Sequence, residues 1–238
     1  MTPDLHDQVA LVTGAGRGIG RALTLALARR GATVVAAART ESQLHRVAAE
    51  AAGKVVPWRL DLTDADDVAD VFRAVGERFA RLDILINNAG LGLYGPVAEM
   101  PLEQFDRVLT VNLRGGFAAC QQAMRLMIPR RRGYIINISS VVGFKGYPNQ
   151  AAYTASKHGL MGLTKSLAVE AATHDIRVSA VLPGGVDTDM VAQARPDLDR
   201  SILIHPEDIA TTVLYLLSLS DRAHVDQIYI RRRTASPF

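Results

Sequence analysis

Short apolar runs rich in valine and isoleucine alternate with amphipathic stretches along nearly the whole chain of 238 residues. Continuous apolar runs of this length predict strands that are buried on both faces, as in a parallel sheet between two layers of helices. Regular alternation of strand and helix predicts a doubly wound α/β fold. The sequence therefore predicts a single Rossmann-fold domain over residues 1–238, with a parallel sheet of about seven strands and helices on both faces.

The order of the expected elements places the sites where ligands bind. In such sheets ligands bind outside the carboxyl ends of the strands, at the point where the strand order reverses. The predicted strands are Val9–Thr13, Thr33–Ala37, Val55–Leu60, Ile84–Asn87, Ile135–Ser139, Arg177–Leu182 and Gln227–Ile230. The predicted helices cover residues 18–30, 41–51, 64–79, 101–112, 115–128, 151–174 and 206–219.

Composition argues against several classes of protein. No apolar run reaches the ~18 residues that span a bilayer, and the first residues lack the apolar core of a secretory signal. The single cysteine, Cys120, cannot form an internal disulfide and fits a reducing compartment, so we expect a cytoplasmic protein. The six histidines show no metal-ligand spacing, so no metal is expected. The basic runs Arg130–Arg132 and Arg231–Arg233 indicate solvated loop and tail residues rather than a nucleic-acid site.

A glycine-rich loop, Thr13–Gly20, joins the first predicted strand to the first helix. Glycines let the backbone turn tightly and approach a pyrophosphate, whose charge the N-terminus of the next helix favours. The general Gly-x-Gly-x-x-Gly pattern fails because its third glycine falls on Ile19, whereas the spacing Gly14-x-x-x-Gly18-x-Gly20 fits. The loop predicts a dinucleotide site, and the residues expected against the cofactor are Gly14, Arg17, Gly18, Ile19 and Gly20.

Tyr153 and Lys157 are four residues apart on a predicted helix, and therefore share one of its faces. A cation about 4 Å from a phenol, at an effective dielectric of about 20, stabilises the phenolate by about 4 kcal/mol. That would bring the tyrosine pKa from about 10 toward neutrality, where it can act as a general acid or base. Ser140, at the end of a predicted strand, could hold a carbonyl oxygen meanwhile. Taken alone, the pair is also compatible with an ordinary surface contact.

These motifs together resemble the short-chain dehydrogenase/reductase family. The resemblance rests on Thr-Gly-x-x-x-Gly-x-Gly, on Asn87-Asn88-Ala89-Gly90 after the fourth strand, and on Ser140 with Tyr153-x-x-x-Lys157, and it runs from about residue 9 to residue 219. It implies hydride transfer between a nicotinamide cofactor and a ketone or aldehyde, or a secondary alcohol in reverse. Tyr153 would donate the proton, Ser140 would hydrogen-bond the carbonyl oxygen, and Lys157 would lower the tyrosine pKa and hold the nicotinamide ribose. Asn112 resembles the asparagine that interrupts a helix and anchors a water leading to the lysine.

The end of the second strand indicates which nicotinamide cofactor is used. Enzymes that use NAD place a carboxylate there to accept from the ribose 2′-hydroxyl. Here that position is Ala38, and Arg39 follows it, with Arg17 in the glycine loop nearby. Two guanidiniums favour the 2′-phosphate of NADP. Glu41 reaching the ribose is the alternative.

Further cofactor contacts follow from the resemblance. The pair Asp61 and Leu62 corresponds to adenine contacts, although a cap for the helix beginning near Asp64 is the alternative. The floor under the ribose would be formed by Asn88, Ala89 and Gly90. A Pro-Gly turn leaving the sixth strand would bring backbone and hydroxyl groups to the nicotinamide carboxamide, and its members are Pro183, Gly184, Val186 and Thr188.

A segment over about residues 186–206 should cover the substrate, and its short length predicts an open pocket. The expected pocket walls are Leu91, Leu93, Tyr94, Val142, Phe144, Tyr147, Gln150 and Met190. The resemblance implies a homotetramer or homodimer, and small residues along the helix from Ala151 permit close helix packing. The chain departs from the family's usual Gly-Gly ending, which weakens the expectation of a tetramer.

The leading hypothesis is an NADP-dependent reductase of a ketone or aldehyde. One subclass reduces 3-oxoacyl thioesters on an acyl carrier protein, for which Arg130–Arg132 offers a basic rim. A non-catalytic protein that senses NADP would usually have lost Tyr153 or Lys157. Nucleotide-sugar epimerases and dehydratases share Tyr-x-x-x-Lys, but they are longer and space their glycines differently.

Overall fold

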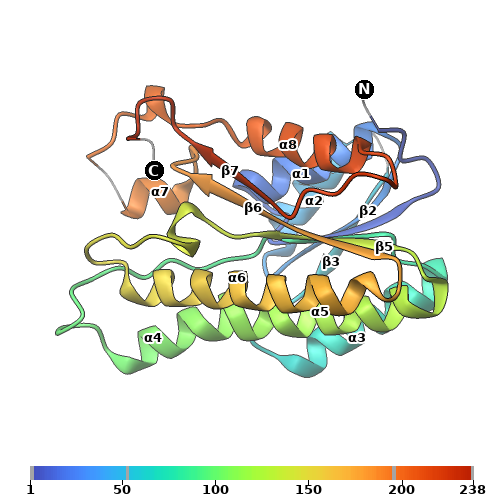
Figure 1. Ribbon diagram of the computed structural model, residues 1–238, viewed down its shortest axis with the longest axis horizontal. Coiled ribbons are helices and arrows are strands. Elements are labelled where there is room, and N and C mark those ends of the chain that lie inside the picture. Colours follow the sequence, from blue (N-terminus) through green and yellow to red (C-terminus); the bar gives the residue numbers. More distant parts are fainter. Residues whose placement is uncertain (1–2, 52–53, 195–196, 237–238) are drawn as a thin grey trace.

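The computed structural model (Figure 1) describes residues 3–51, 54–194 and 197–236. One seven-stranded sheet runs through it in the order β3-β2-β1-β4-β5-β6-β7, with every neighbouring pair parallel. The strands are β1 (Val9–Thr13), β2 (Thr33–Ala38), β3 (Val55–Arg59), β4 (Ile84–Asn87), β5 (Gly133–Ile138), β6 (Ile176–Gly184) and β7 (Gln227–Arg231). The predicted doubly wound Rossmann-type sheet is confirmed, and its order reverses between β1 and β4.

Helices cover both faces of the sheet, as Figure 1 shows: α1, α2 and α8 lie on one side, and α3, α4, α5 and α6 on the other. The α-helices are α1 (Gly18–Arg29), α2 (Glu41–Glu50), α3 (Ala65–Phe79), α4 (Leu102–Leu109), α5 (Gly115–Met127), α6 (Ala151–Ala172), α7 (Asp189–Ala194) and α8 (Pro206–Ser218). The shorter ones are the π-helix η1 (Thr110–Arg114) and the 3₁₀ helices η2 (Ile128–Arg130), η3 (Val141–Gly143) and η4 (Arg200–Ile202).

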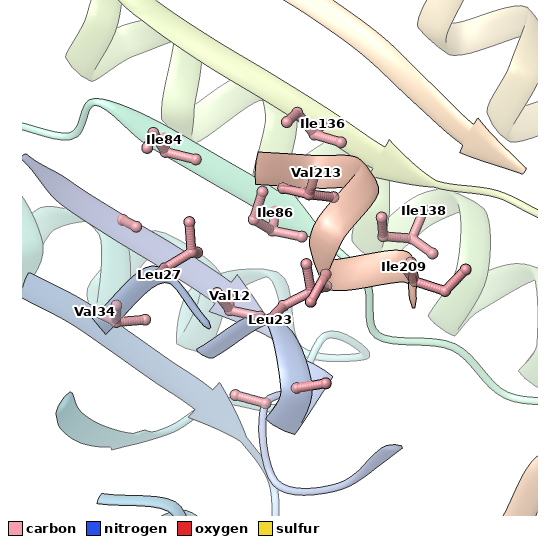
Figure 2. Close-up of a cluster of buried hydrophobic side chains, with 14 of the residues drawn as sticks. Val12, Leu23, Leu27, Val34, Ile84, Ile86, Ile136, Ile138, Ile209 and Val213 are labelled. Atoms are coloured by element: carbon pink, nitrogen blue, oxygen red, sulfur yellow. The ribbon is translucent and has the colours of Figure 1, made fainter. Parts of the chain in front are cut away.

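The two faces of the sheet bury alternate residues of the same strands. On the face of α1 and α8, side chains such as Val12 and Ile86 pack against Leu23 and Val213 (Figure 2). On the opposite face, neighbouring strand residues such as Leu11 pack against α3, α5 and α6. Because successive side chains of a strand point to opposite faces, an apolar run fills both layers.

Two predicted boundaries differ from the structure in ways that affect the site. The sixth strand was expected to end at Leu182, but β6 continues to Gly184 because Pro183 and Gly184 pair with Ile230 and Arg231 of β7. The predicted Pro-Gly turn is therefore wrong, and the chain leaves the sheet at Gly185, whose φ is +78°. The predicted helix over 101–112 ends early, since the π-helix η1 replaces its last turn.

The predicted covering segment begins with a strand bridge and a short helix. Val186 pairs with Ile204 in an isolated parallel bridge, and α7 and η4 lie between them. Residues 195 and 196 of this segment lie outside the described residues. The bridge joins the two ends of the segment to one another.

Candidate active site

A cavity of about 600 Å³ opens at the carboxyl ends of the strands, on either side of the switch point between β1 and β4. Fourteen of the predicted site residues line it: Gly14, Arg17, Gly18, Ile19, Gly20, Arg39, Asp61, Leu62, Asn88, Ala89, Gly90, Tyr153, Lys157 and Thr188. Five others lie outside its walls: Asn112, Ser140, Pro183, Gly184 and Val186. The structure thus brings together residues that are spread over most of the sequence.

The glycine loop is shaped so that its backbone can approach a ligand in the cavity. Gly14 and Gly18 have φ values of +66° and +53°, in the left-handed region that glycine favours. A Cβ atom on Gly20 would lie 2.1 Å from the carbonyl oxygen of Gly14, so no larger residue fits. No side chain in the described part of the chain caps α1, which leaves its first N–H groups free for a bound anion. The loop therefore fits a dinucleotide pyrophosphate.

Asn88 ties the loop after β4 to the end of β1. Its side-chain amide donates to the carbonyl oxygens of Thr13 at 2.9 Å and Gly14 at 3.4 Å. The Thr13 hydroxyl accepts in turn from the backbone N–H groups of Asn88 and Ala89, both at 3.0 Å. These bonds hold the two cofactor loops in one arrangement.

The two arginines expected to select NADP lie in different electrostatic settings. Arg39 is exposed on the cavity wall, and its guanidinium makes no hydrogen bond or ion pair with any described residue. Arg17 forms an ion pair across the cavity with Asp189 of α7, with 2.8 Å between Nη1 and Oδ2. The acid beside Arg17 is a feature that the sequence did not indicate.

Asp61 and Leu62 both lie on the cavity wall, where adenine contacts were predicted. The cap of α3 is Asp64 itself, which accepts from the N–H groups of Asp66 and Asp67. Although partial burial raises the pKa of Asp61, hydrogen bonds from Thr63 and the positive charge of Arg39 lower it overall. Asp61 is therefore ionised at neutral pH.

Tyr153 lines the cavity, and Ser140 lies beside it, outside the cavity wall. Ser140 follows β5, Tyr153 lies in the first turn of α6, and the Ser140 hydroxyl is close enough to the phenol to favour its ionised form. The other serine, Ser139, instead lies near the carbonyl oxygen of Lys157, at 3.4 Å. The ring of Tyr94 packs edge-on against Tyr153, with centroids 5.9 Å apart. The structure thus places Ser140, rather than Ser139, beside the phenol.

The expectation that Lys157 lowers the pKa of Tyr153 is wrong for this arrangement. Burial raises the pKa of Tyr153, the neighbouring Tyr94 raises it further, and the bond with Ser140 offsets only part of this. The Lys157 ammonium lies 5.7 Å from the centre of the Tyr153 ring and donates to the carbonyl oxygen of Ile138 at 2.9 Å. The phenol therefore keeps its proton at neutral pH.

Lys157 is buried, with 3% of its surface exposed, and burial lowers its pKa to about 8. Its ammonium faces the cavity close to the loop after β4: a Cβ atom on Gly90 would lie 3.8 Å from Nζ. A partly titrating ammonium at this point can hold a ribose hydroxyl and pass a proton.

Asn112 lies in the π-helix, as the predicted interruption of a helix requires. Its side-chain oxygen accepts from the N–H of Leu91 at 2.7 Å, and its amide donates to the Leu91 carbonyl at 2.9 Å and to Ser156 at 3.0 Å. π-Bulges are frequent at functional sites. This one fixes the loop after β4; the predicted water toward Lys157 stays a prediction.

The segment from the end of β6 to Thr188 is divided between the core and the cavity. The carbonyl oxygen of Pro183 lies 3.4 Å from the Ser140 hydroxyl. Val186 is buried in the core, whereas Thr188 reaches the glycine loop, where a Cβ atom on Gly18 would lie 3.1 Å from its methyl group. The covering segment therefore closes over the phosphate loop at Thr188.

Of the predicted pocket walls, only Leu91 and Met190 line the cavity. Phe144 and Tyr147 are exposed and lie outside the cavity wall, and Gln150 precedes the first turn of α6. The site also contains residues that the sequence did not single out, among them Gln43 and Arg200. Arg200 pairs with Asp187 at 2.6 Å. The signal that could have predicted such ion pairs is the presence of both acids, Asp187 and Asp189, and a base, Arg200, in the covering segment.

Features outside the cavity bear on the other predictions. Two of the three arginines in the run Arg130–Arg132 are ion-paired, Arg130 with Asp83 at 3.5 Å and Arg131 with Asp175 at 2.6 Å. Among the residues described, no cluster of three or more His, Cys, Asp or Glu could hold a metal ion. In the same residues no helix is long and apolar enough to cross a membrane.

Comparisons with known proteins match the chain over nearly its full length. A family model for short chain dehydrogenases matches residues 8–199. The 3-oxoacyl-[acyl-carrier-protein] reductase FabG of Thermotoga maritima is 40% identical over 226 residues, which cover 90% of this chain and 92% of that protein. A 3beta-hydroxysteroid dehydrogenase of Mediterraneibacter gnavus is 40% identical over 196 residues, covering 81% of this chain and 71% of that protein.

A solved structure shares the whole architecture. The crystal structure of a metagenomic short-chain oxidoreductase in complex with NADP superposes with a TM-score of 0.86 at 36% identity, covering 98% of this chain and 100% of that one. Relatives equally similar to this chain are named for a thioester and for a steroid. Overall similarity therefore does not identify the substrate.

Proposed function

The chain belongs to the short-chain dehydrogenase family of oxidoreductases, and we propose that it reduces a ketone or aldehyde with NADPH, Tyr153 acting as the general acid. The observation that carries this proposal is Tyr153, which lies beside the Ser140 hydroxyl and lines a cavity whose glycine loop fits a dinucleotide. The reverse reaction would oxidise a secondary alcohol at the same groups.

The chemistry that we propose divides between the cofactor and the protein. NADPH supplies the hydride when it is bound. The Ser140 hydroxyl donates a hydrogen bond to the substrate carbonyl oxygen, which orients the carbonyl and stabilises developing negative charge. The phenol of Tyr153 protonates that oxygen, and its raised pKa keeps the proton in place until the transfer. Lys157 holds the nicotinamide ribose and, with its pKa lowered to about 8, returns a proton toward Tyr153.

The preference for NADP rests on charge at the outer end of the cavity. Arg39 has a free guanidinium on the wall, and its position follows β2, where a 2′-phosphate would lie. Arg17 would add a second contact once it exchanges Asp189 for the phosphate. The related structure with NADP supports the same assignment by similarity.

A 3-oxoacyl thioester is the more specific substrate that the Thermotoga relative favours. The run Arg130–Arg132 is a weaker candidate for binding an acyl carrier protein, because two of its three charges are already paired within the chain. We retain three further proposals from the sequence: a homotetramer or homodimer, a cytoplasmic location, and no nucleic-acid or membrane partner.

Replacement of the general acid tests the proposal. Tyr153→Phe should cut NADPH-dependent reduction of a responsive carbonyl compound by at least about a thousandfold, while the Kd for NADPH stays within about twofold. Turnover is followed by NADPH absorbance over a panel of ketones, aldehydes and oxoacyl thioesters, and the Kd by fluorescence. Tyr94→Phe is the matched control and should change turnover less than tenfold. Equal turnover in Tyr153→Phe, or a wild-type protein that binds NADPH and reduces nothing, would refute the proposal.

A further inference from the structure

A run of three arginines, Arg231–Arg233, begins at the last residue of β7, and the structure gives them different surroundings. The Nη1 group of Arg231 donates to the carbonyl oxygens of Arg232 at 3.2 Å, Arg233 at 3.4 Å and Ala235 at 2.6 Å. The N–H of Ala235 also donates to the carbonyl of Arg232 at 3.0 Å. Arg231 thus organises the tail into a turn, which holds Arg232 in a defined position.

Arg232 packs directly on Gly185. A Cβ atom on Gly185 would lie 2.8 Å from Cδ and 3.0 Å from Nε of Arg232, so the arginine side chain could not keep its present position. Gly185 also has a φ of +78°, which a larger residue would adopt only with strain. The missing side chain at residue 185 therefore makes the room that the arginine occupies.

This contact lies close to the catalytic serine. Pro183, two residues before Gly185, has its carbonyl oxygen 3.4 Å from the Ser140 hydroxyl. Gly184 lies against Val141, since a Cβ atom there would come within 2.5 Å of that side chain. In Figure 1 the ends of β6 and β7 lie beside α7, on the side of the molecule that carries the covering segment. Arg232 thus packs against the chain two residues beyond the carbonyl that faces Ser140.

Arg232 as a residue is half-buried, and its guanidinium makes no ion pair or hydrogen bond with any other described residue. Asp187, two residues beyond Gly185, is already paired with Arg200 at 2.6 Å. A partly desolvated cation without a partner is costly, and an oxyanion that bound it would compensate that cost. The planar fork of arginine matches carboxylate and phosphate oxygens.

A second cation and three aromatic rings stand on the loop that follows Ser140 and on β7. The Lys145 ammonium lies 5.8 Å from the ring centres of both Tyr147 and Tyr229. Phe144 packs against Tyr229 with centroids 5.0 Å apart. Lys145 and Arg232 therefore give this side of the site a positive charge beside an apolar surface.

We propose that Arg232 is a specificity-determining residue, which binds an oxyanion on the carbonyl substrate, so that the preferred substrates are keto acids or oxoacyl compounds bearing phosphate. This inference rests on the proposed reductase function. The carbonyl carbon gains the hydride of NADPH, the carbonyl oxygen gains the proton of Tyr153, and the tyrosine regains a proton from solvent through Lys157. The oxyanion is unchanged, so a keto acid yields a hydroxy acid and NADP⁺.

The test compares one carbonyl group with and without charge. Wild type, Arg232→Met and Arg232→Lys are assayed with NADPH and 3-oxobutanoate, its ethyl ester and its coenzyme A thioester. We expect Arg232→Met to lower the ratio of kcat/KM for the acid over the ester at least tenfold, mainly through KM, and Arg232→Lys to restore part of it. Arg233→Met, which removes the same charge from the neighbouring exposed residue, should leave the ratio unchanged. A large loss for the thioester alone would assign the oxyanion to the carrier's phosphates.

A binding measurement separates this inference from the reductase function. Calorimetry measures 3-hydroxybutanoate binding to the enzyme–NADP⁺ complex, with and without Arg232→Met. Binding that Arg232→Met weakens at least tenfold supports the oxyanion site even if no carbonyl compound is reduced, an outcome that would refute only the proposed function. An acid-to-ester ratio that Arg232→Met does not change, or equal calorimetric binding in both proteins, would overturn the role of Arg232. Thermal unfolding of each variant confirms that it is folded.

Discussion

The two ends of the active site are built by different means. At the cofactor end, glycine backbone, the Thr13–Asn88 hydrogen bonds and the start of α1 form the cavity, and most of these residues are buried or half-buried. At the proposed substrate end, outside the cavity wall, side chains such as Phe144, Tyr147 and Arg232 stand on connections between elements, and the first two are 47% and 42% exposed. A site made of backbone tolerates little change, whereas a site made of exposed side chains can vary without disturbing the fold.

Substituting one glycine at each end of the site should give the largest difference in NADPH affinity and stability. Gly20→Ala forces a Cβ atom to within 2.1 Å of the Gly14 carbonyl, so we expect NADPH affinity to fall at least a hundredfold or the protein to misfold. Gly146→Ala, on the loop after Ser140, meets nothing within 4 Å and should change neither affinity nor stability measurably. NADPH titration by fluorescence and thermal unfolding provide both readouts. Similar losses in the two variants would remove the distinction.

Lys157 contributes to both ends of the site. We expect its burial to lower the stability of the folded protein, although the residue supports turnover. Lys157→Met should lower kcat at least about a hundredfold. The unfolded lysine titrates near 10.5 and the folded one near 8, so below pH 8 the folded state bears the cost of a buried charge, about 3 kcal/mol. Between pH 8 and 10.5 the folded lysine loses its proton first, and wild-type stability rises relative to the variant.

The measurement for Lys157 is urea unfolding of the cofactor-free protein at pH 7 and pH 9.5. We expect Lys157→Met to be at least as stable as wild type at pH 7 and to lose part of that advantage at pH 9.5. Lys165→Met, at an exposed position of the same helix, should show no pH-dependent difference. A variant that is less stable at pH 7 by the same amount as at pH 9.5 would contradict a buried, charged lysine.

Substitution of Arg39 tests whether a side chain, rather than the backbone, selects NADP over NAD. Arg39→Ala should lower kcat/KM for NADPH about tenfold to a hundredfold and leave that for NADH unchanged, because a charge-assisted hydrogen bond contributes about 1.5–3 kcal/mol. Steady-state kinetics with both cofactors measure the ratio. Arg46→Ala removes an exposed charge from nearby α2 and serves as the control. An equal loss with NADH would show that Arg39 does not contact the 2′-phosphate.

Substitution of Asp189 should change cofactor binding least, and it should strengthen rather than weaken the binding of NADPH. Asp189→Asn releases Arg17 from an exposed ion pair, which costs at most about 1 kcal/mol to break. NADPH should therefore bind up to about fivefold more tightly at low salt, as measured by fluorescence titration. Asp187→Asn, which frees Arg200 instead, is the matched control. Weaker NADPH binding in Asp189→Asn would mean that the pair holds the covering segment in a productive position.

Local sequence was sufficient for much of this protein. Continuous apolar runs determine strands that are buried on both faces, and the position of Gly14, Gly18 and Gly20 between strand and helix determines a phosphate loop, since both depend on neighbours in the chain. Ser140 was also predicted from the sequence, because its spacing before Tyr153 resembles the family pattern.

Only the tertiary structure decided what depends on residues distant in the chain. It set the pKa of Tyr153 by burial beside Tyr94, overriding the nearby lysine, and it paired Arg17 with Asp189 across 172 residues. It also laid Arg232 on Gly185, in space that a side chain would fill. Desolvation and long-range ion pairs depend on what surrounds a group in space, and no spacing in the sequence records those surroundings.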